Sequence, residues 1–379
     1  MSLRNDRIRK AQELMQARGM AGIMVLNHDD YRYFLGIDRS QPRAIIPWLG
    51  KPVVIAFSAE APELGRLLGS AVEIETFTHV GEQIQVVTTR FREMAETWQR
   101  ASGEEETPAV GLQLWFDTPA FLVEMFRRAN PRIRMVPSDP VMDRLRAVKE
   151  PDELEQLREA QRIAAVGMDR AQSLLRPGVT AHQIATEAVH TMMQEGAEET
   201  ATPVYVNRGV ETCMIHGWIS PGTLRAGDLV VIDLTPKSRG YGANLTRTFV
   251  LGEPVEWQRN LLETYREMIA TTRAHLKPGT TVRELDALGK QICERRDLGQ
   301  YHIDGIAHGI GLRFEEAPAS TILRKHRNLP LREGMTMTIG HTILALPGRG
   351  GVRQEDIYRV TPEGGEVLHP YPIDPVIGM

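Results

Sequence analysis

Cysteine is almost absent from this chain: Cys213 and Cys293 are its only thiols in 379 residues. Two cysteines cannot build a disulfide framework, and neither lies in a CxxC pair that would indicate a redox or zinc site. A reducing compartment is the natural environment for such a chain. We therefore expect a cytoplasmic protein.

Long apolar runs and an excess of basic residues are also absent. No stretch approaches the about 20 apolar residues that span a bilayer, and the amino-terminal segment is charged and helical in pattern, unlike a signal peptide. The 45 basic and 49 acidic residues are interspersed and give a formal net charge of -4. A nucleic-acid-binding protein would normally carry a basic excess. The sequence thus predicts a soluble protein with neither membrane nor nucleic-acid partners.

The features that are present indicate two domains. A chain of this length with 42% hydrophobic residues can bury more than one core. Apolar residues recur at helical spacing over residues 7–18, and Gly19 is placed to end that helix. An apolar strand, a polar turn and a second strand over residues 52–57 follow, and such patterns continue to about residue 140. They predict an α/β amino-terminal domain.

A second domain is predicted to begin with a long charged helix. The helix starts near residue 148, with Pro151 at a plausible first-turn position and acidic residues close behind it. We place the domain boundary just before this helix. The amino-terminal domain would then span residues 1–145, and the second domain residues 146–379.

The second domain contains an internal repeat. Residues 174–188 (LLRPGVTAHQIATEA) resemble residues 275–289 (HLKPGTTVRELDALG), and residues 224–233 (LRAGDLVVID) resemble residues 331–340 (LREGMTMTIG). Each unit has the pattern of two helices followed by a β-hairpin. This duplication predicts an α+β fold whose two hairpins face each other across a pseudo-twofold axis. Polar residues on the inward faces of both hairpins would then meet at one central site.

Both hairpins carry polar residues where that site would form. Asp233 ends an apolar strand, where an unpaired carboxylate would be costly, so a cation, a metal ion or several donors should accompany it. The alternative is that Asp233 caps the following turn through backbone amides. Counting along the repeat sets Asp233 opposite Gly340 and Asn244 opposite Glu355.

Five segments of the second domain carry a specific resemblance; they are residues 227–233 (GDLVVID), 240–252 (GYGANLTRTFVLG), 307–318 (AHGIGLRFEEAP), 333–341 (EGMTMTIGH) and 350–356 (GGVRQED). In this order they resemble the motifs of the creatinase/prolidase/methionine-aminopeptidase family. Residues 7–36 also resemble the creatinase-type amino-terminal domain. The resemblance covers almost the whole chain. It implies a pita-bread fold for the second domain, preceded by an α/β creatinase-type domain.

The resemblance also identifies five metal-ligand positions, and this chain departs from the family at two of them. The family's first Asp, its His and its final Glu are kept as Asp233, His308 and Glu355. The bridging Asp of the family is Asn244 here, and the Glu of its TIEP motif is Gly340. Two divalent cations a few Å apart need several carboxylates to bridge them and to offset their charge. We therefore expect no dinuclear metal centre.

A single metal ion is the alternative to a site without any metal. Asp233, His308 and Glu355 would provide one imidazole and two carboxylates with open positions, compatible with zinc, iron or manganese. His341 follows Gly340 where the family has Pro. It is either a replacement ligand or a histidine at the edge of the core. We expect no metal cofactor, with this mononuclear site as the alternative.

Three further side chains are candidates for catalysis or substrate binding. His216 matches the position of a catalytic or substrate-binding His of the family, and in creatinase, which needs no metal, that His transfers a proton. Glu315 replaces a His that contacts the substrate, which favours a cationic group on the substrate, unless Glu315 pairs with an arginine of the protein. Arg353 is kept, and its planar guanidinium suits a substrate carboxylate.

The predicted site divides into two groups, and the amino-terminal domain adds weaker candidates. We predict catalytic roles for His216, Asp233 and Glu355. We predict substrate contacts for His308, Arg353, Glu315, Asn244 and His341. Related proteins are usually homodimers whose amino-terminal domain reaches the site of the partner. A homodimer is therefore expected, with Tyr31, Tyr33 and Arg39 as possible contacts; core packing and surface charge are their alternative roles.

The favoured function is hydrolysis of a C–N bond in a small amidine, guanidino or amide compound, as in creatinase, without a dinuclear metal centre. His216 would move the proton, Asp233 and Glu355 would orient nitrogen groups, and Arg353 would hold a carboxylate. The first alternative is an Xaa-Pro dipeptidase or aminopeptidase with a mononuclear metal site. The second is a lyase or a non-catalytic binding protein on the same scaffold, because function resides in the site and not in the fold.

Overall fold

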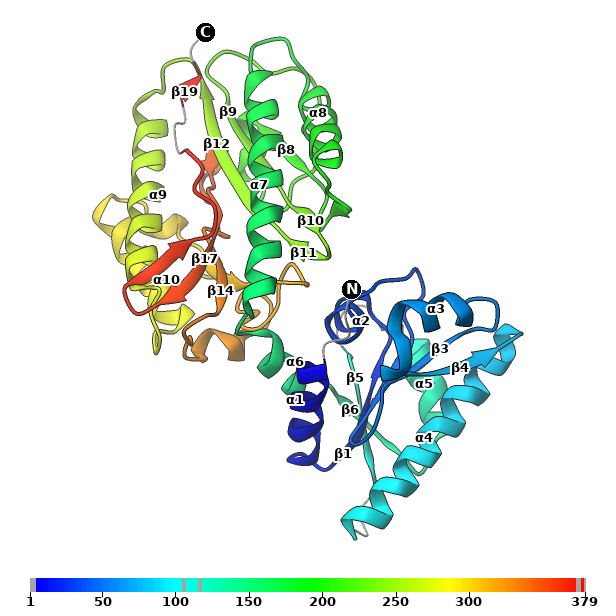
Figure 1. Ribbon diagram of the computed structural model, residues 1–379. Helices are drawn as coiled ribbons and strands as arrows, with labels where there is room; N and C mark the ends of the chain where they lie inside the picture. Colours follow the sequence, from blue (N-terminus) through cyan, green and yellow to red (C-terminus); the bar gives the residue numbers. More distant parts are fainter. Residues whose placement is uncertain (1–4, 104–106, 115–117, 373–375, 378–379) are drawn as a thin grey trace. The chain divides into compact units, whose positions relative to one another are not determined.

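The computed structural model describes residues 5–103, 107–114, 118–372 and 376–377 (Figure 1). The chain divides into two compact units, Met1–Leu145 and Arg146–Met379. We describe each unit by itself. None of the described helices is long and apolar enough to cross a membrane.

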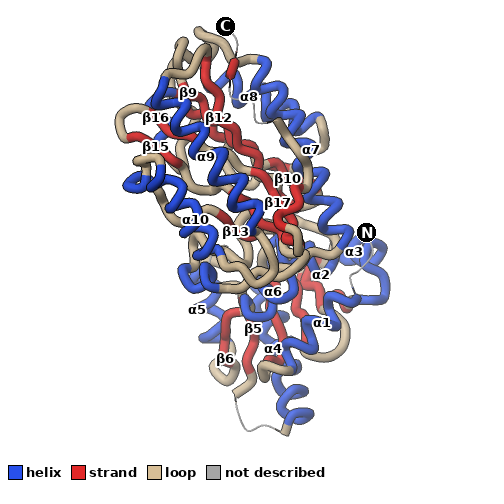
Figure 2. Tube along the Cα trace, turned by 90° about the vertical axis from the view of Figure 1, so that its left-hand side faces the viewer, coloured by secondary structure: helices blue, strands red, loops and turns tan. Residues whose placement is uncertain are grey.

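The amino-terminal unit is an α/β structure built on one six-stranded sheet with strand order β4-β3-β2-β1-β5-β6. Its central strand β1 is buried at every residue, and α4 packs against the sheet (Figure 2). The strands are β1 (Met20–Val25), β2 (Ala44–Pro47), β3 (Val53–Phe57), β4 (Glu73–Phe77), β5 (Ala109–Leu112) and β6 (Arg134–Pro137). The helices are α1 (Asn5–Gln16), α2 (His28–Leu35), α3 (Ala61–Leu68), α4 (Val80–Ser102), α5 (Ala120–Ala129) and α6 (Asp139–Arg146), with the short 3-10 helix η1 (Gly69–Ala71).

The first predicted elements of this unit are present, with one correction. The amino-terminal helix forms as α1, and Gly19, with φ +62°, ends the turn that follows it. The segment predicted as a polar turn after β1 is instead the helix α2. Asn27 begins α2, because its side chain accepts a hydrogen bond of 2.8 Å from the backbone N–H of Asp30. Polar residues after a strand therefore signalled a helix cap here.

The carboxy-terminal unit contains the predicted repeat of two helices and a hairpin. The first copy has α7 (Pro151–Ser173), α8 (Ala181–Gln194), β7 (Glu199–Thr200), β8 (Tyr205–Arg208), η2 (Gly209–Cys213), β9 (Leu229–Leu234), β10 (Pro236–Ser238), β11 (Tyr241–Gly242) and β12 (Leu245–Leu251). The second copy has α9 (Glu256–His275), α10 (Val282–Arg295), η3 (Gly299–Tyr301), β13 (Ala307–Gly309), η4 (Arg324–Asn328), β14 (Thr336–Ile339), β15 (Leu344–Leu346), β16 (Gly350–Val352), β17 (Asp356–Thr361) and β18 (Gly364–Val367), and β19 (Val376–Ile377) follows.

The repeated sequence has a local physical basis at the start of the second helix of each copy. Thr180 begins α8 and Thr281 begins α10, each in a capping box in which the threonine accepts the N–H of Gln183 or Glu284. In each copy a glycine with φ near 90° comes two residues before the capping threonine. The same turn therefore directs both copies back against their own sheets.

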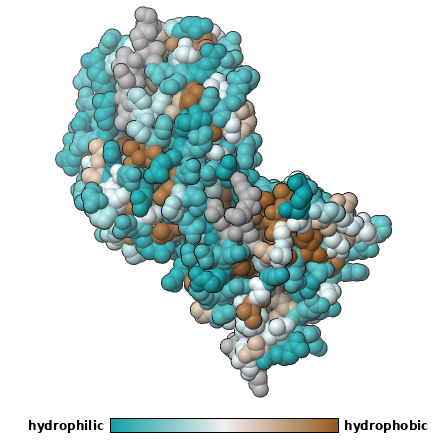
Figure 3. Space-filling model, in the orientation of Figure 1, coloured by the Kyte–Doolittle hydropathy of each residue, from teal (hydrophilic) through white to brown (hydrophobic). Residues whose placement is uncertain are grey.

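The two copies meet edge to edge at the centre of the unit. Their sheets have the orders β19-β12-β9-β8 and β13-β14-β17-β18. Thr246 on β12 and Glu355, just before β17, form an antiparallel bridge with N–H to O distances of 3.2 and 3.1 Å. Each copy has its own hydrophobic core between its sheet and its helices, while hydrophilic side chains cover most of the visible outer face (Figure 3). The seam between the hairpins is thus where inward polar residues converge.

A buried ion cluster ties the start of this unit to the loop between β13 and η4, and it should make stability depend on acid pH. The carboxylate of Glu316 lies against Arg146 and 2.5 Å from Lys149 Nζ, and all three side chains are at most 6% exposed. Burial alone would raise the pKa of Glu316, but the two cations hold this pKa below its usual range. The ionised Glu316 therefore stabilises the fold above a pH of about 4.3, the unfolded value for glutamate. This contribution should disappear as the pH falls through the lower folded pKa.

Urea unfolding of the wild-type protein and of Glu316→Gln between pH 7 and pH 3 would measure this effect. The variant should be less stable at pH 7 by about 3 kcal/mol, because two buried cations lose their carboxylate. The difference should shrink towards pH 3. The exposed Glu294 provides a matched control, since Glu294→Gln should follow the wild-type curve. Parallel pH curves for wild type and Glu316→Gln would contradict the assignment.

Candidate active site

Glu355 is the centre of the hydrogen-bond network at the seam. Its carboxylate is fully buried. Asn244 Nδ2 donates to Oε1 over 3.1 Å, and Thr246 Oγ1 donates to Oε2 over 2.6 Å. Arg353 Nη2 lies 2.7 Å from the same Oε2. Residues of both hairpins therefore supply the partners of one carboxylate, as the repeat predicted for Asn244 and Glu355.

Arg353 connects this carboxylate to the one on the other hairpin. Its Nη1 lies 3.5 Å from Asp233 Oδ2 and donates to the carbonyl oxygen of Ile215 over 3.0 Å. The cation predicted beside Asp233 is therefore a guanidinium of the chain itself. Both terminal nitrogens of Arg353 face protein acceptors. To hold a substrate carboxylate with them, Arg353 would have to release Glu355 or Asp233.

The two buried carboxylates differ in their affinity for a proton. Burial raises the pKa of Asp233 to about 7, since Arg353 opposes this rise only in part and the charge of Glu355 adds to it. Burial also acts to raise the pKa of Glu355, but Arg353 and the hydrogen bonds from His341 and Thr246 hold it at about 2. One guanidinium thus favours one negative charge in the pair, and that charge is on Glu355.

Three histidines surround the carboxylates. The ring of His341 lies 4.9 Å from the ring of His308 and 5.8 Å from that of His216. His341 Nδ1 is 3.6 Å from Glu355 Oε1 and 3.5 Å from Arg353 Nη2. His308 and His341 are buried, whereas His216, in the loop after η2, is exposed. Burial lowers the pKa of His341, which favours a neutral imidazole.

Glu315 lies on the opposite side of His341 from Glu355. Its Oε1 is 4.0 Å from His341 Nε2, and its Oε2 accepts a hydrogen bond from Thr321 Oγ1. The predicted alternative of an arginine partner is not what the structure shows, because the neighbours of Glu315 are histidines and a threonine. His308, Glu315 and His341 each offer a ligand atom within 4.8 Å of the others, so this group could hold a metal ion.

The structure thus brings all the predicted residues of the second domain to one place, and it adds two that the sequence analysis did not name. Thr246 binds Glu355, and Thr321 binds Glu315. A signal for Thr246 was available, because alternate residues of a strand share a face and Asn244 lies two positions before it. Thr321 is six residues after Glu315 in a loop, and no sequence pattern indicated that contact.

The candidates in the amino-terminal unit make contacts within that unit, and their predicted contact with a partner's site stays a prediction. Tyr31 and Tyr33 are at most 2% exposed within the core of that unit. Arg39 pairs with Glu60. The contacts of these side chains are the packing and charge pairing that were their alternative interpretation.

The residues present do not fit a two-metal centre. Asn244 has replaced one carboxylate, and it donates its amide to Glu355. Gly340 has no side chain, and a Cβ built there would lie 1.7 Å from the carbonyl oxygen of Gln354. The guanidinium of Arg353 lies against both remaining carboxylates. Two divalent ions would add positive charge where one cation already balances the pair.

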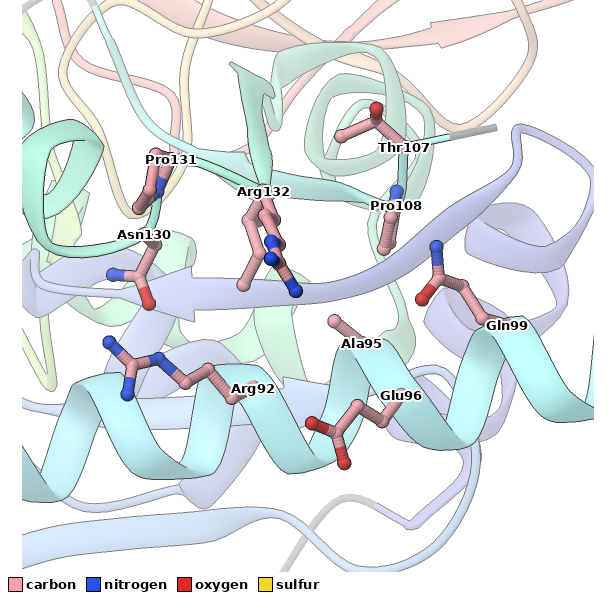
Figure 4. A pocket seen from close by; sticks show the side chains of 10 residues that line it. Arg92, Ala95, Glu96, Gln99, Thr107, Pro108, Asn130, Pro131 and Arg132 are labelled. Atoms are coloured by element: carbon pink, nitrogen blue, oxygen red, sulfur yellow. The ribbon is translucent and has the colours of Figure 1, made fainter. Parts of the chain in front are cut away.

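A cavity of about 720 Å³ belongs to the amino-terminal unit alone (Figure 4). It lies between α4, which contributes Arg92 and Glu96, and the segments before β5 and β6, which contribute Pro108 and Arg132. Its lining mixes both charges with apolar groups. The described residues of the candidate active site come from the other unit.

Sequence comparisons place the chain among known proteins. The pattern of metallopeptidase family M24 matches residues 155–362, which is more than half of the chain. The chain belongs to metallopeptidase family M24. The creatinase/prolidase amino-terminal domain matches residues 7–148. The family is a peptidase family, so the chain is a hydrolase, and metal dependence is a property of the family.

The relatives of this M24 chain match from about two thirds to nearly all of its length. An Xaa-Pro dipeptidase of Pyrococcus horikoshii is 26% identical over 368 residues, covering 97% of this chain and 98% of the relative. The Xaa-Pro dipeptidase of Pyrococcus furiosus is 32% identical over 247 residues, 65% of this chain and 70% of the relative. The solved structure of an Xaa-Pro dipeptidase from Bacillus anthracis superposes with a TM-score of 0.85 at 24% identity over 99% of both chains. The architecture is therefore the pita-bread fold with a creatinase-type amino-terminal domain.

Proposed function

We propose that this protein hydrolyses the amide bond of small peptides of the Xaa-Pro type, with at most one metal ion per chain. The observation that carries the proposal is the convergence of His216, Asp233, His308 and Glu355 on one seam, in a chain similar to Xaa-Pro dipeptidases over nearly its full length. This substrate was our first alternative from sequence. It now takes precedence over the amidine or guanidino substrate, because the relatives named above are dipeptidases.

The positions of the side chains suggest a role for each of them in peptide hydrolysis. His216 is exposed beside the buried network, so its imidazole is placed to exchange a proton with a bound substrate. Arg353, held by Asp233 and Glu355, fixes a positive charge below the substrate, and a fixed charge in a dry site stabilises negative charge that develops on a carbonyl oxygen. A metal ion held by His308 and its neighbours would polarise the same carbonyl and make a bound water more acidic.

A metal-independent hydrolase of the creatinase type is the second candidate. The observation that favours it is the guanidinium between Asp233 and Glu355, since an internal cation there removes the need for a metal ion to balance the carboxylates. Glu315, where the family has a His, would add a carboxylate for a cationic nitrogen group. A lyase, or a ligand-binding protein without activity, could use the same residues. The turnover measurements described next would reveal either.

The two candidates predict opposite results for metal-depleted protein. Turnover should be measured on Xaa-Pro dipeptides, non-proline dipeptides and guanidino acids, with the protein first depleted of metal and then supplied with Mn²⁺, Co²⁺ or Zn²⁺. We expect cleavage of Xaa-Pro dipeptides that returns with one equivalent of metal. Guanidine hydrolysis by depleted protein would replace this proposal with the second candidate. Turnover that requires two equivalents would refute both.

A further inference from the structure

We propose that His308, Glu315 and His341 form a mononuclear metal site of their own, displaced from the ligand set that the family uses. Their ligand atoms lie within 4.8 Å of one another. Glu315 and His341 stand where the family pattern has a His and a Pro, so two of the three candidate ligands depart from that pattern. The proposal deepens the proposed function by naming the cofactor of the same site, but metal binding can be tested without turnover.

His308 is built as a ligand rather than as a core residue. The ring is fully buried, and its Nε2 has no hydrogen-bond partner among the described residues. Its Nδ1 lies 3.0 Å from the carbonyl oxygen of Gly309. A proton on Nδ1 satisfies that carbonyl and leaves a lone pair on Nε2. Metal-bound histidines are oriented in this way, whereas an unpaired buried nitrogen without a ligand is costly.

His341 has the matching arrangement. Its Nδ1 faces Glu355 Oε1 at 3.6 Å and Arg353 Nη2 at 3.5 Å, so this nitrogen already has protein partners and Nε2 is the one left for a ligand. Its Nε2 is 4.0 Å from Glu315 Oε1, which is too far for a hydrogen bond. The rings of His341 and His308 are nearly perpendicular, with centroids 4.9 Å apart. A cation between these atoms would be bonded to all three groups.

Glu315 supplies the negative charge. Thr321 Oγ1 donates to Oε2, and Oε1 is the oxygen that faces His341. The side chain is only 14% exposed. Ligand atoms about 2.1 Å from a tetrahedral zinc ion lie about 3.4 Å apart, so side-chain rotations that bring these atoms up to about 1.4 Å closer are sufficient. Two neutral imidazoles and one carboxylate are a ligand set for Zn²⁺, Fe²⁺ or Mn²⁺ with open positions for water or substrate.

The contacts at the metal-ligand positions of the family explain why the proposed metal site is displaced from them. Asn244 donates to Glu355, and the guanidinium of Arg353 lies against both Glu355 and Asp233, although Asp233 Oδ1 has no hydrogen-bond partner among the described residues. The predicted single-ion set of Asp233, His308 and Glu355 would have to displace that guanidinium. The carboxylate of Glu315 has histidines and a hydroxyl around it instead. A metal ion is therefore better accommodated on the Glu315 side of His341.

Titration of the full-length, metal-depleted protein with Co²⁺ tests the site through the visible absorption of the bound ion. We expect one equivalent per chain. His341→Ala and Glu315→Ala should weaken binding by more than about 100-fold, because loss of an orienting partner alone costs about 10–100-fold. Thr321→Val should weaken it by about 10-fold. Asp233→Asn should leave the affinity within about threefold of wild type.

The controls separate a lost ligand from a lost fold. His190→Ala, at an exposed position of α8, should bind Co²⁺ like wild type. If His341→Ala or Glu315→Ala lowers the melting temperature of the metal-free protein, its loss of Co²⁺ binding could come from a damaged fold. The Co²⁺ affinities of Thr321→Val and Asp233→Asn then test the site instead. Loss of binding in Asp233→Asn with retention in Glu315→Ala would overturn the proposal, as would absence of Co²⁺ binding. Binding without Xaa-Pro turnover would refute the proposed function and support the site; Xaa-Pro turnover by protein that binds no metal would do the reverse.

Discussion

Replacing Gly340 with alanine is expected to lower the free energy of unfolding by about 4–6 kcal/mol. Gly340 has φ +104°, a conformation that costs other residues about 1–3 kcal/mol. A Cβ there would lie 1.7 Å from the carbonyl oxygen of Gln354 and 2.9 Å from Ile269 Cδ1. Overpacking usually costs about 1–3 kcal/mol, and more where the obstacle is backbone. Urea unfolding followed by circular dichroism would measure the change.

Gly348 provides the matched control for this prediction. It also has a positive φ, +75°, but a Cβ built there meets no heavy atom within 4 Å among the described residues. Gly348→Ala should therefore lose only about 1–2 kcal/mol, from the backbone conformation alone. Equal losses at Gly340 and Gly348 would contradict the steric argument. The larger loss at Gly340 would mean that the family's glutamate cannot be restored here without moving the segment between β16 and β17, which carries Gln354.

Replacing His216 with alanine is expected to lower kcat/KM for an Xaa-Pro dipeptide by about 10²- to 10⁴-fold. That is the usual contribution of a positioned general acid or base. His216 is the exposed histidine of the three, 5.8 Å from the ring of His341, where it can reach a substrate. Because an exposed side chain contributes little to packing, the free energy of unfolding should change by no more than about 0.5 kcal/mol. Steady-state kinetics and urea unfolding of the same preparation test both statements.

A fall in kcat at unchanged KM would assign proton transfer to His216, and a rise in KM alone would assign substrate binding. His190→Ala, at an exposed helical position, should leave both constants unchanged. Wild-type kinetics for His216→Ala would refute a catalytic role for this residue. The result does not depend on where a metal ion binds, because His216 is outside the proposed ligand set.

The sequence patterns were most informative where structure depends on neighbours in the chain. Pro151 begins α7 as predicted, since proline is favoured in the first turn of a helix. The repeat is confirmed because each copy carries its own capping threonine and turn glycine, which act over a few residues. The polar stretch after β1 was wrongly taken for a turn. The Asn27 cap of α2 is an equally local device, but polar turn residues and capping residues are of the same types.

The contacts inside the site followed from sequence only in part. The repeat predicted that Asn244 and Glu355 would face each other, and they share a hydrogen bond. Arg353 was expected to bind a substrate carboxylate, yet both its terminal nitrogens contact protein acceptors. Which acceptor a long side chain reaches depends on its rotamer and on the other copy of the repeat. The spacing of residues in the sequence indicates neither the rotamer nor the position of the other copy.

By itself, the sequence predicted a duplicated α+β unit after an α/β amino-terminal domain, and its resemblance to the family implied that Asn244 and Gly340 stand at two of the metal-ligand positions. These are statements about residue identity, order and local propensity, which do not require coordinates. Only the tertiary structure decided that Arg353 lies between Asp233 and Glu355, and that Glu315 comes within 4.0 Å of His341. The contacts of Arg353 with Asp233 and of Glu315 with His341 join segments that are far apart in the chain. Their partners depend on how the two hairpins meet.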